Sequence, residues 1–234
     1  MKISGFQKMT LLDYPGKVAA ILFTSGCNFR CPFCHNASFV THIDNSRFFS
    51  EEEVLDYLRK RKGILDGVCI TGGEPLLQED IGEFIEKIKV LGYSVKLDTN
   101  GFLPERLKAL LDKGLIDYVA MDIKNSPEKY GQTVGIENFP ISPIEESIEL
   151  LKNGKIDYEF RTTVVKEFHT EDDIEAIAKW ISGAKRYFLQ SFLDSGDLIS
   201  DGLSAHEPSV LCNMQQKASQ FIVNTEIRGQ QHKI

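Results

Sequence analysis

The sequence lacks any long apolar run. The longest run near its start covers Val18 to Phe23, far short of the ~20 residues that a membrane-spanning helix needs. A charged-then-apolar leader is also missing from Met1 to Ser4. The cysteine pattern, described below, is not that of a disulfide-bonded protein. We therefore expect a protein of the reducing cytoplasm that does not associate with a membrane.

The sequence is also short of positive charge. Its 27 lysines and arginines face 34 aspartates and glutamates, which gives a net charge of −7, whereas a nucleic-acid groove normally shows a basic stripe. The one basic cluster, Arg59 to Lys62, follows Glu51 to Glu53 in the order that a helix dipole favours. We therefore expect a solvated helix end there and no nucleic-acid partner.

No linker, residue repeat or low-complexity tract divides the chain, so residues 1–234 are expected to form a single domain. Apolar periodicity and turn residues predict alternating strands and helices. Six strand–helix units in series require a parallel sheet with helical crossovers, and six is two short of a closed eight-unit barrel. The predicted fold is an α/β open partial (βα)6 barrel, with strands at 17–24, 67–71, 94–98, 118–122, 158–164 and 187–190, helices at 50–62, 79–91, 104–113, 143–152 and 170–181, and a last helix (207–220) and strand (221–227) within residues 205–228.

Three of the five cysteines, Cys27, Cys31 and Cys34, lie in one loop at residues 24–36 in a C-x3-C-x2-C pattern. A short loop can aim three thiolates at one point, whereas disulfides between such close neighbours would be strained. Zinc normally takes four ligands in two spaced pairs, and a cluster that only carries electrons usually has four cysteines. The pattern therefore favours a [4Fe–4S] cluster with one iron left open for a substrate or cofactor. Cys69 and Cys212 lie far from the loop and are expected to be buried core thiols.

Polar residues follow the predicted strands at the point where each one ends. In α/β sheets with parallel strands, chemistry gathers at these carboxyl ends. We therefore expect one cavity lined by carboxylates, amides and two cations, which suits a zwitterionic, adenosine-bearing ligand better than it suits a bare electron carrier. The residues are Gly72, Gly73, Glu74, Asp98, Thr99, Asn100, Asp122, Lys124, Arg161, Gln190 and Ser191.

Several short segments match one known family. Besides the cysteine loop with His35 and Asn36, they are Leu12-Asp-Tyr-Pro-Gly16, Thr71-Gly-Gly-Glu-Pro75, Leu97-Asp-Thr-Asn-Gly101 and Met121-Asp-Ile-Lys124. With these motifs the chain resembles the radical S-adenosylmethionine (SAM) enzymes. It is most similar to their glycyl-radical-enzyme activases, and among these to the second group of anaerobic ribonucleotide reductase activating proteins. The similarity covers the chain as far as about Arg161 and is weak beyond it.

The resemblance implies that the three thiolates hold [4Fe–4S] and that SAM chelates the open iron through its amine and carboxylate. One electron then cleaves SAM, and a 5′-deoxyadenosyl radical takes a hydrogen atom from the substrate. Phe33 would contact adenine, or else fill apolar space in the loop. Gly72 and Gly73 would let the backbone approach SAM, or simply make a tight turn. Glu74 would receive the methionyl ammonium or support that turn, and Asn100 would add to the SAM contacts.

The same resemblance implies roles for the charged residues. Asp98, Thr99 and Asp122 are similar to a monovalent-cation site beside the SAM carboxylate, which hard oxygen ligands would suit. Capping of the loops after the strands is the alternative. Lys124 and Arg161 would pair with the SAM carboxylate, or form structural ion pairs with nearby acids.

The partners are inferred from what surrounds the cysteine loop. Residues 37–49 hold no further cysteine, so the electron would come from outside, from a small flavodoxin or ferredoxin. An open barrel mouth suits a macromolecular substrate, such as the glycyl loop of a partner enzyme. His35 directly follows a ligand and is expected to structure the loop or to face the partner. Two alternatives stay open, namely a radical SAM enzyme acting on a small molecule, such as a deazaguanine-forming synthase, and a non-catalytic iron–sulfur protein.

The ligand assignment predicts about four irons and four sulfides per chain after anaerobic reconstitution. Replacing Cys27, Cys31 or Cys34 by Ala should abolish SAM cleavage, because each change removes a cluster ligand. Formation of 5′-deoxyadenosine measures the cleavage. Cys69→Ala and Cys212→Ala are the matched controls and should keep it, and loss of the cluster in Cys69→Ala would contradict the assignment.

Overall fold

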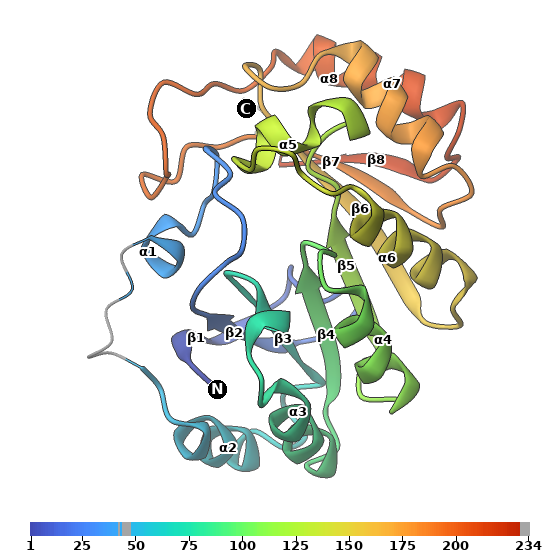
Figure 1. Ribbon diagram of the computed structural model, residues 1–234. Helices are drawn as coiled ribbons and strands as arrows, with labels where there is room; N and C mark the ends of the chain where they lie inside the picture. Colours follow the sequence, from blue (N-terminus) through green and yellow to red (C-terminus); the bar gives the residue numbers. More distant parts are fainter. Residues whose placement is uncertain (42, 44–47, 230–234) are drawn as a thin grey trace. The chain divides into compact units, whose positions relative to one another are not determined.

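Strands and helices alternate along the computed structural model, which describes residues 1–41, 43 and 48–229 (Figure 1). Within this part of the chain the strands are β1 (Ile3–Thr10), β2 (Ala19–Thr24), β3 (Gly67–Gly72), β4 (Ser94–Thr99), β5 (Tyr118–Asp122), β6 (Asp157–Val164), β7 (Tyr187–Ser191) and β8 (Thr225–Arg228). The α-helices are α1 (Ala37–Val40), α2 (Glu51–Lys60), α3 (Ile81–Val90), α4 (Pro104–Asp112), α5 (Tyr130–Val134), α6 (Ser142–Asn153), α7 (Glu171–Trp180) and α8 (Pro208–Ser219).

The strand order follows the chain from β1 to β8 and is linear, so the sheet is not closed. β1 pairs with β2 antiparallel, whereas the β2–β3, β3–β4, β6–β7 and β7–β8 pairs are parallel. The predicted open α/β class is thereby confirmed. Contacts group the residues into two compact units, so the single domain stays a prediction. Unit 1 comprises Met1–Asn28, Asn36–Ala120 and Lys155–Asp157, and unit 2 comprises Phe29–His35, Met121–Gly154 and Tyr158–Ile234.

Unit 1 is built on the parallel pairing of β2, β3 and β4. Leu22, Ile70 and Leu97, one from each strand, are completely buried, as expected for β-branched and apolar runs covered by helices. Helix α2 begins where the sequence predicts it, because Ser50 and Glu53 form a capping box in which the Glu53 N–H donates to the Ser50 hydroxyl at 3.2 Å.

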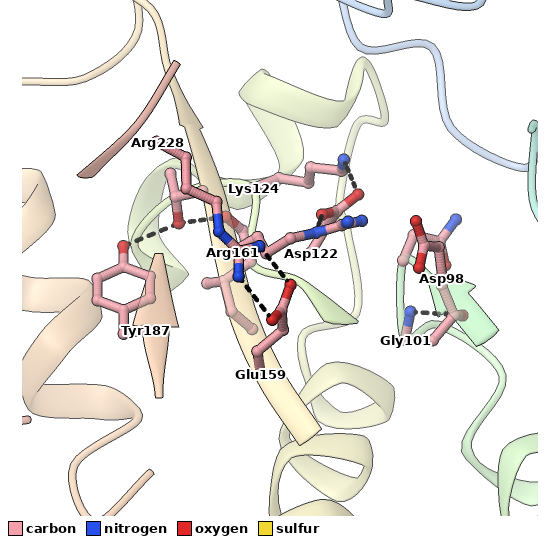
Figure 2. A network of polar contacts seen from close by, with 12 residues as sticks. Asp98, Gly101, Asp122, Lys124, Glu159, Arg161, Tyr187 and Arg228 are labelled. Carbon is pink, nitrogen blue, oxygen red and sulfur yellow. Dashed lines mark hydrogen bonds and ion pairs between the residues drawn. The ribbon is translucent and has the colours of Figure 1, made fainter. Parts of the chain in front are cut away.

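Unit 2 contains β6, β7 and β8, with α7 and α8 packed against each other (Figure 1). Tyr158, Phe160 and Tyr187 are among its largest fully buried side chains. The Tyr187 hydroxyl donates to the Thr162 hydroxyl at 2.8 Å, so this phenol is satisfied inside the core (Figure 2).

Three expectations are corrected at the ends of the chain. β1 is absent from the predicted elements because six of its eight residues are half-exposed or exposed, and its apolar positions do not alternate clearly. The last strand starts at Thr225, later than expected, because the N–H groups of Phe221 and Ile222 both donate to the Ala218 carbonyl and complete the final turn of α8. Cys212 is exposed on α8, so its prediction as a buried core thiol is wrong, whereas Cys69 is buried.

No helix among the described residues is long and apolar enough to cross a membrane.

His169 is a fully buried histidine of unit 2. Its Nδ1 accepts a hydrogen bond from the Val165 N–H at 3.1 Å, so Nε2 carries the proton and donates to the Lys124 carbonyl at 2.8 Å. Burial lowers the pKa of this ring, although the contacts with the Lys124 and Val165 backbone act in the opposite direction. The neutral imidazole therefore holds the backbone of Lys124, a role that no sequence pattern indicated.

The low pKa of His169 predicts a pH dependence of stability. When the pH falls through the ordinary histidine pKa of 6.5, the unfolded chain takes up a proton that the folded ring excludes, so the free energy of unfolding should decrease. Urea titrations between about pH 5.5 and pH 8 measure this slope. In His169→Gln the slope should become shallower, and His206→Gln controls for the loss of a histidine. An unchanged slope in His169→Gln would contradict the assignment.

Candidate functional site

The cysteine loop starts in unit 1, directly after β2. The Cys27 thiol is half-buried, and its sulfur lies 3.8 Å from the Asn100 Nδ2 donor. Asn100 also donates to the Asn28 side chain at 2.8 Å. The amide that follows β4 therefore supports both the first cysteine and its neighbour, and an N–H donor of this kind stabilises a thiolate ligand.

The second and third cysteines belong to unit 2. The Cys34 N–H donates to the Cys31 carbonyl at 3.1 Å, which makes the tight turn that the C-x2-C spacing requires. Cys31 is 7% exposed, and it lies near enough to Lys124 to contribute to the raised pKa of that ammonium. All five cysteines lie in the described part of the chain, and none is in a disulfide. An amide donor beside Cys27 and a cation near Cys31 are each suited to a thiolate that binds a cluster.

Phe33 and His35 flank Cys34 and pack within unit 2. Phe33 is buried against Phe168, with ring centroids 5.6 Å apart. The His35 ring stacks on Phe192, also at 5.6 Å. These contacts agree with apolar filling by Phe33 and with the loop-structuring role of His35, while the contact of Phe33 with adenine stays a prediction.

Gly72 and Gly73 are needed for close approach of backbone to backbone. A Cβ on Gly73 would lie 1.9 Å from the Gly26 carbonyl oxygen, and one on Gly72, where φ is +113°, would lie 2.3 Å from the Thr24 nitrogen. The N–H groups of Gly73 and Glu74 donate to the carbonyls of Thr24 and Gly26, both at 2.8 Å. The glycine pair thus packs the end of β3 against the residues that lead into the cysteine loop, and its approach to SAM stays a prediction.

Glu74 is 1% exposed and organises the same region. Its carboxylate accepts hydrogen bonds from the Leu76 N–H at 3.0 Å, the Thr99 hydroxyl at 2.8 Å and the Asn100 N–H at 2.7 Å. It therefore supports the turn after β3 and joins it to the end of β4, which is the second of the two expected roles. Binding of the methionyl ammonium stays a prediction.

Asp98 has a cationic partner within unit 1. Its carboxylate accepts a short hydrogen bond from the ammonium of Lys96, which is 2% exposed. The sulfur of Cys69 lies 3.8 Å from both groups. Lys96 was missed because a lysine between the apolar residues of a predicted strand ordinarily indicates an exposed face.

Asp122, Lys124 and Arg161 form one ion-pair network in unit 2 (Figure 2). The Asp122 carboxylate accepts from Lys124 Nζ at 2.9 Å and from Arg161 Nε at 3.0 Å. Burial alone would raise the pKa of Asp122, but the charges of Arg161 and Lys124 outweigh it and lower the pKa to about 2. Burial alone would likewise lower the pKa of Lys124, and the Asp122 charge raises it instead. The structural ion pair named as an alternative is therefore present, and pairing with the SAM carboxylate stays a prediction.

A small cavity opens beyond the ends of β6, β7 and β8 in unit 2. Its volume is about 210 Å³, and Thr163, Gln190 and Ser191 are among the residues that line it. Arg228 also lines it, but its guanidinium is held by both oxygens of Glu159, at 2.7 and 3.0 Å (Figure 2). This fork neutralises the charge of Arg228 and leaves amide and hydroxyl groups to bind a ligand.

The expected site residues thus form well-connected groups in each unit. Cys27, Gly72, Gly73, Glu74, Asp98, Thr99 and Asn100 belong to unit 1, and Cys31, Phe33, Cys34, Asp122, Lys124 and Arg161 to unit 2. Their convergence on one cavity stays a prediction.

The environment of Glu74 predicts that Glu74→Ala is destabilising. The change would leave three donors without their acceptor in a buried place, and each unsatisfied donor typically costs about 1–3 kcal/mol. The free energy of unfolding, from anaerobic urea titrations, should therefore fall by at least about 2 kcal/mol. Glu83→Ala, which removes an exposed carboxylate from α3, is the control. Equal stability of the two variants would show that the Glu74 contacts contribute little.

Comparison with known proteins shows the family to which the chain belongs. The family model of the radical SAM superfamily matches residues 21–181. A protein of Methanocaldococcus jannaschii, provisionally named a glycyl-radical enzyme activating enzyme, is 35% identical over an alignment 239 residues long, which covers 97% of this chain and 95% of that protein. The pyruvate formate-lyase-activating enzyme of Listeria monocytogenes is 33% identical over 60% of each chain. The GTP 3′,8-cyclase of Aquifex aeolicus is 31% identical over 90% of this chain and 67% of the cyclase.

Solved structures show the same fold. SuiB of Streptococcus suis, bound to its precursor peptide SuiA, superposes with a TM-score of 0.71 at 14% identity, over 89% of this chain and 48% of SuiB. A domain of the pyruvate-formate lyase-activating enzyme from Bacteroides vulgatus gives a TM-score of 0.57 at 18% identity, over 70% of this chain and 99% of that domain. SuiB bound to SAM is a further match, at a TM-score of 0.69.

The family match covers more than half of the 234 residues and includes all three cysteines of the loop. The chain belongs to the radical SAM superfamily, and its cofactors are a [4Fe–4S] cluster and SAM.

Proposed function

We propose that this protein is an activating enzyme that installs a glycyl radical on a partner polypeptide, such as an anaerobic ribonucleotide reductase. The observation that carries the proposal is the 35% identity to a protein named as such an activating enzyme, because the match spans nearly the full length of both chains. The similarity to pyruvate formate-lyase-activating enzyme supports the same class.

In this proposal Cys27, Cys31 and Cys34 hold the cluster. When bound and given one electron, the cluster and SAM would supply removal of one hydrogen atom from the partner's glycine, with methionine and 5′-deoxyadenosine as the products. Lys124 and Arg161 would orient the SAM carboxylate, with Asp122 holding both cations in place. The other proposed SAM contacts are Phe33, Gly72, Gly73, Glu74, Asp98, Thr99 and Asn100.

The electron is proposed to come from a separate flavodoxin or ferredoxin. The two cysteines outside the loop do not suit a second cluster, since Cys69 is buried in β3 and Cys212 is exposed on α8.

The charges around the strand ends of unit 2 favour a polypeptide over a nucleotide. A triphosphate is recognised by cations that remain available to it. In the cavity beyond β6, β7 and β8, however, the guanidinium of Arg228 is already paired with Glu159. The amide of Gln190 and the hydroxyls of Thr163 and Ser191 in the neighbouring cavity suit the N–H and C=O groups of a peptide backbone.

A small-molecule substrate is the second candidate, since the chain is also similar to a GTP 3′,8-cyclase over 90% of its length. A radical SAM enzyme acting on a nucleotide or a deazaguanine precursor would share the cysteine loop and the SAM contacts. Such an enzyme would differ from an activating enzyme in the substrate that it binds next to SAM. Only an experiment with candidate substrates separates the two functions.

The proposal predicts a radical on the partner. Reduced, reconstituted protein with SAM and a co-encoded glycyl radical enzyme should give an anaerobic electron paramagnetic resonance doublet, because one α-hydrogen remains on the glycine. Air should then cleave the partner's backbone at that residue. A short peptide carrying only the glycine should react poorly, since remote contacts provide much of the positioning.

Two controls accompany this experiment. Cys27→Ala protein should give neither the doublet nor 5′-deoxyadenosine. GTP in place of the partner should leave 5′-deoxyadenosine formation at its background rate. If 5′-deoxyadenosine forms but every glycyl radical candidate stays radical-free, the activating role is wrong and the small-molecule alternative replaces it.

A further inference from the structure

Lys96 places a positive charge inside unit 1. Its side chain is 2% exposed, although it lies on a strand whose buried neighbours Val95 and Leu97 are apolar. Burying an ammonium is costly unless it is paired and hydrogen-bonded. Here the Lys96 ammonium donates a hydrogen bond to the Asp98 carboxylate. Asp98 lies two residues further along β4, on the same face of the strand.

The third member of this group is Cys69, from the neighbouring strand β3. Cys69 is directly opposite Lys96 in the strand register, and its sulfur lies 3.8 Å from Lys96 Nζ and 3.8 Å from the Asp98 carboxylate. Sulfur is a soft atom and a poor ligand for a hard monovalent metal ion, but it is an adequate weak acceptor for an ammonium N–H. The chemistry of the group fits a lysine better than it fits sodium or potassium.

One oxygen of Asp98 and the Thr99 hydroxyl, both expected to hold such a metal ion, are engaged by protein atoms. One oxygen of Asp98 accepts from Lys96 and lies near Cys69. The Thr99 hydroxyl donates to Glu74 at 2.8 Å and accepts from the Gly101 N–H at 3.1 Å. A hard cation needs several oxygen ligands directed at one point, and in unit 1 these two side chains are directed at protein partners instead.

We infer that the Lys96 ammonium is a built-in cation of the SAM site and takes the place of the monovalent metal ion that the sequence motif implies. The inference rests on the proposed role of Asp98 and Thr99 beside the SAM carboxylate. Lys96 then acts as a positioning residue, which keeps Asp98 neutralised and oriented while SAM binds. SAM binding by this protein does not depend on added sodium or potassium.

The first test uses the unaltered holoenzyme. SAM is titrated into reconstituted protein by anaerobic calorimetry in NaCl, KCl or choline chloride at equal ionic strength, because choline is too large for a metal site. The dissociation constant should change by less than about twofold between the three salts. A loss of about tenfold or more in choline chloride would overturn the inference.

The second test removes the ammonium in Lys96→Met, which keeps a long apolar side chain. SAM affinity should fall by about tenfold or more in choline chloride, because a charge-assisted contact is lost, and sodium or potassium should restore part of it. Lys89→Met, which removes a lysine paired with Asp117 at the surface of α3, is the matched control and should bind SAM like the unaltered protein. Equal affinity of Lys96→Met and the unaltered protein in every salt would overturn the inference.

These measurements stay decisive if Lys96→Met does not fold or loses its cluster, because the salt comparison on the unaltered protein then stands alone. They also use no partner enzyme. Absence of a glycyl radical would therefore refute the proposed function without affecting this inference, and a metal-dependent SAM affinity would refute this inference without affecting the proposed function.

Discussion

The close packing of Gly73 against Gly26 is the contact on which the rest of unit 1's site depends. A Cβ at Gly73 would lie 1.9 Å from the Gly26 carbonyl oxygen, so no other residue fits there without moving the backbone. Two backbone hydrogen bonds of 2.8 Å, from Gly73 and Glu74 to Thr24 and Gly26, complete the junction. Because β2 and β3 are parallel, this junction brings the start of the cysteine loop and the Glu74 turn to the same edge.

Paired charges that are buried or half-buried are the second constraint, and they recur in both units. The Glu74 carboxylate accepts hydrogen bonds from three donors. Lys96 forms an ion pair with Asp98, and Asp122 forms ion pairs with Lys124 and Arg161. Leaving one partner of such a pair unmatched would be strongly unfavourable. The same networks give the region fixed dipoles and charges, and this preorganisation is what a site needs to bind a zwitterionic cofactor without rearranging.

Much of the fold was predictable because its signals are local. The helix that follows Ser50 depends on a capping box of four residues, and the strand ending at Gly72 depends on a short apolar run. β1 and the true start of β8 were not predictable in this way. β1 is a half-exposed strand that is stabilised by antiparallel pairing with β2, and residues 221–222 complete a helix turn rather than a strand because their N–H groups reach the Ala218 carbonyl.

For the site, the sequence by itself determined the chemistry of the ligands. The spacing of Cys27, Cys31 and Cys34 indicated an open cluster, and the family match agrees with it. Only the tertiary structure decided which polar groups are engaged by the protein itself. It showed Lys96 beside Asp98, His169 holding the Lys124 carbonyl, and Cys212 at the surface. The physical reason is that cluster ligation depends on residue type and local spacing, whereas the burial and pairing of a side chain depend on residues that are distant in sequence and on neighbouring strands or helices.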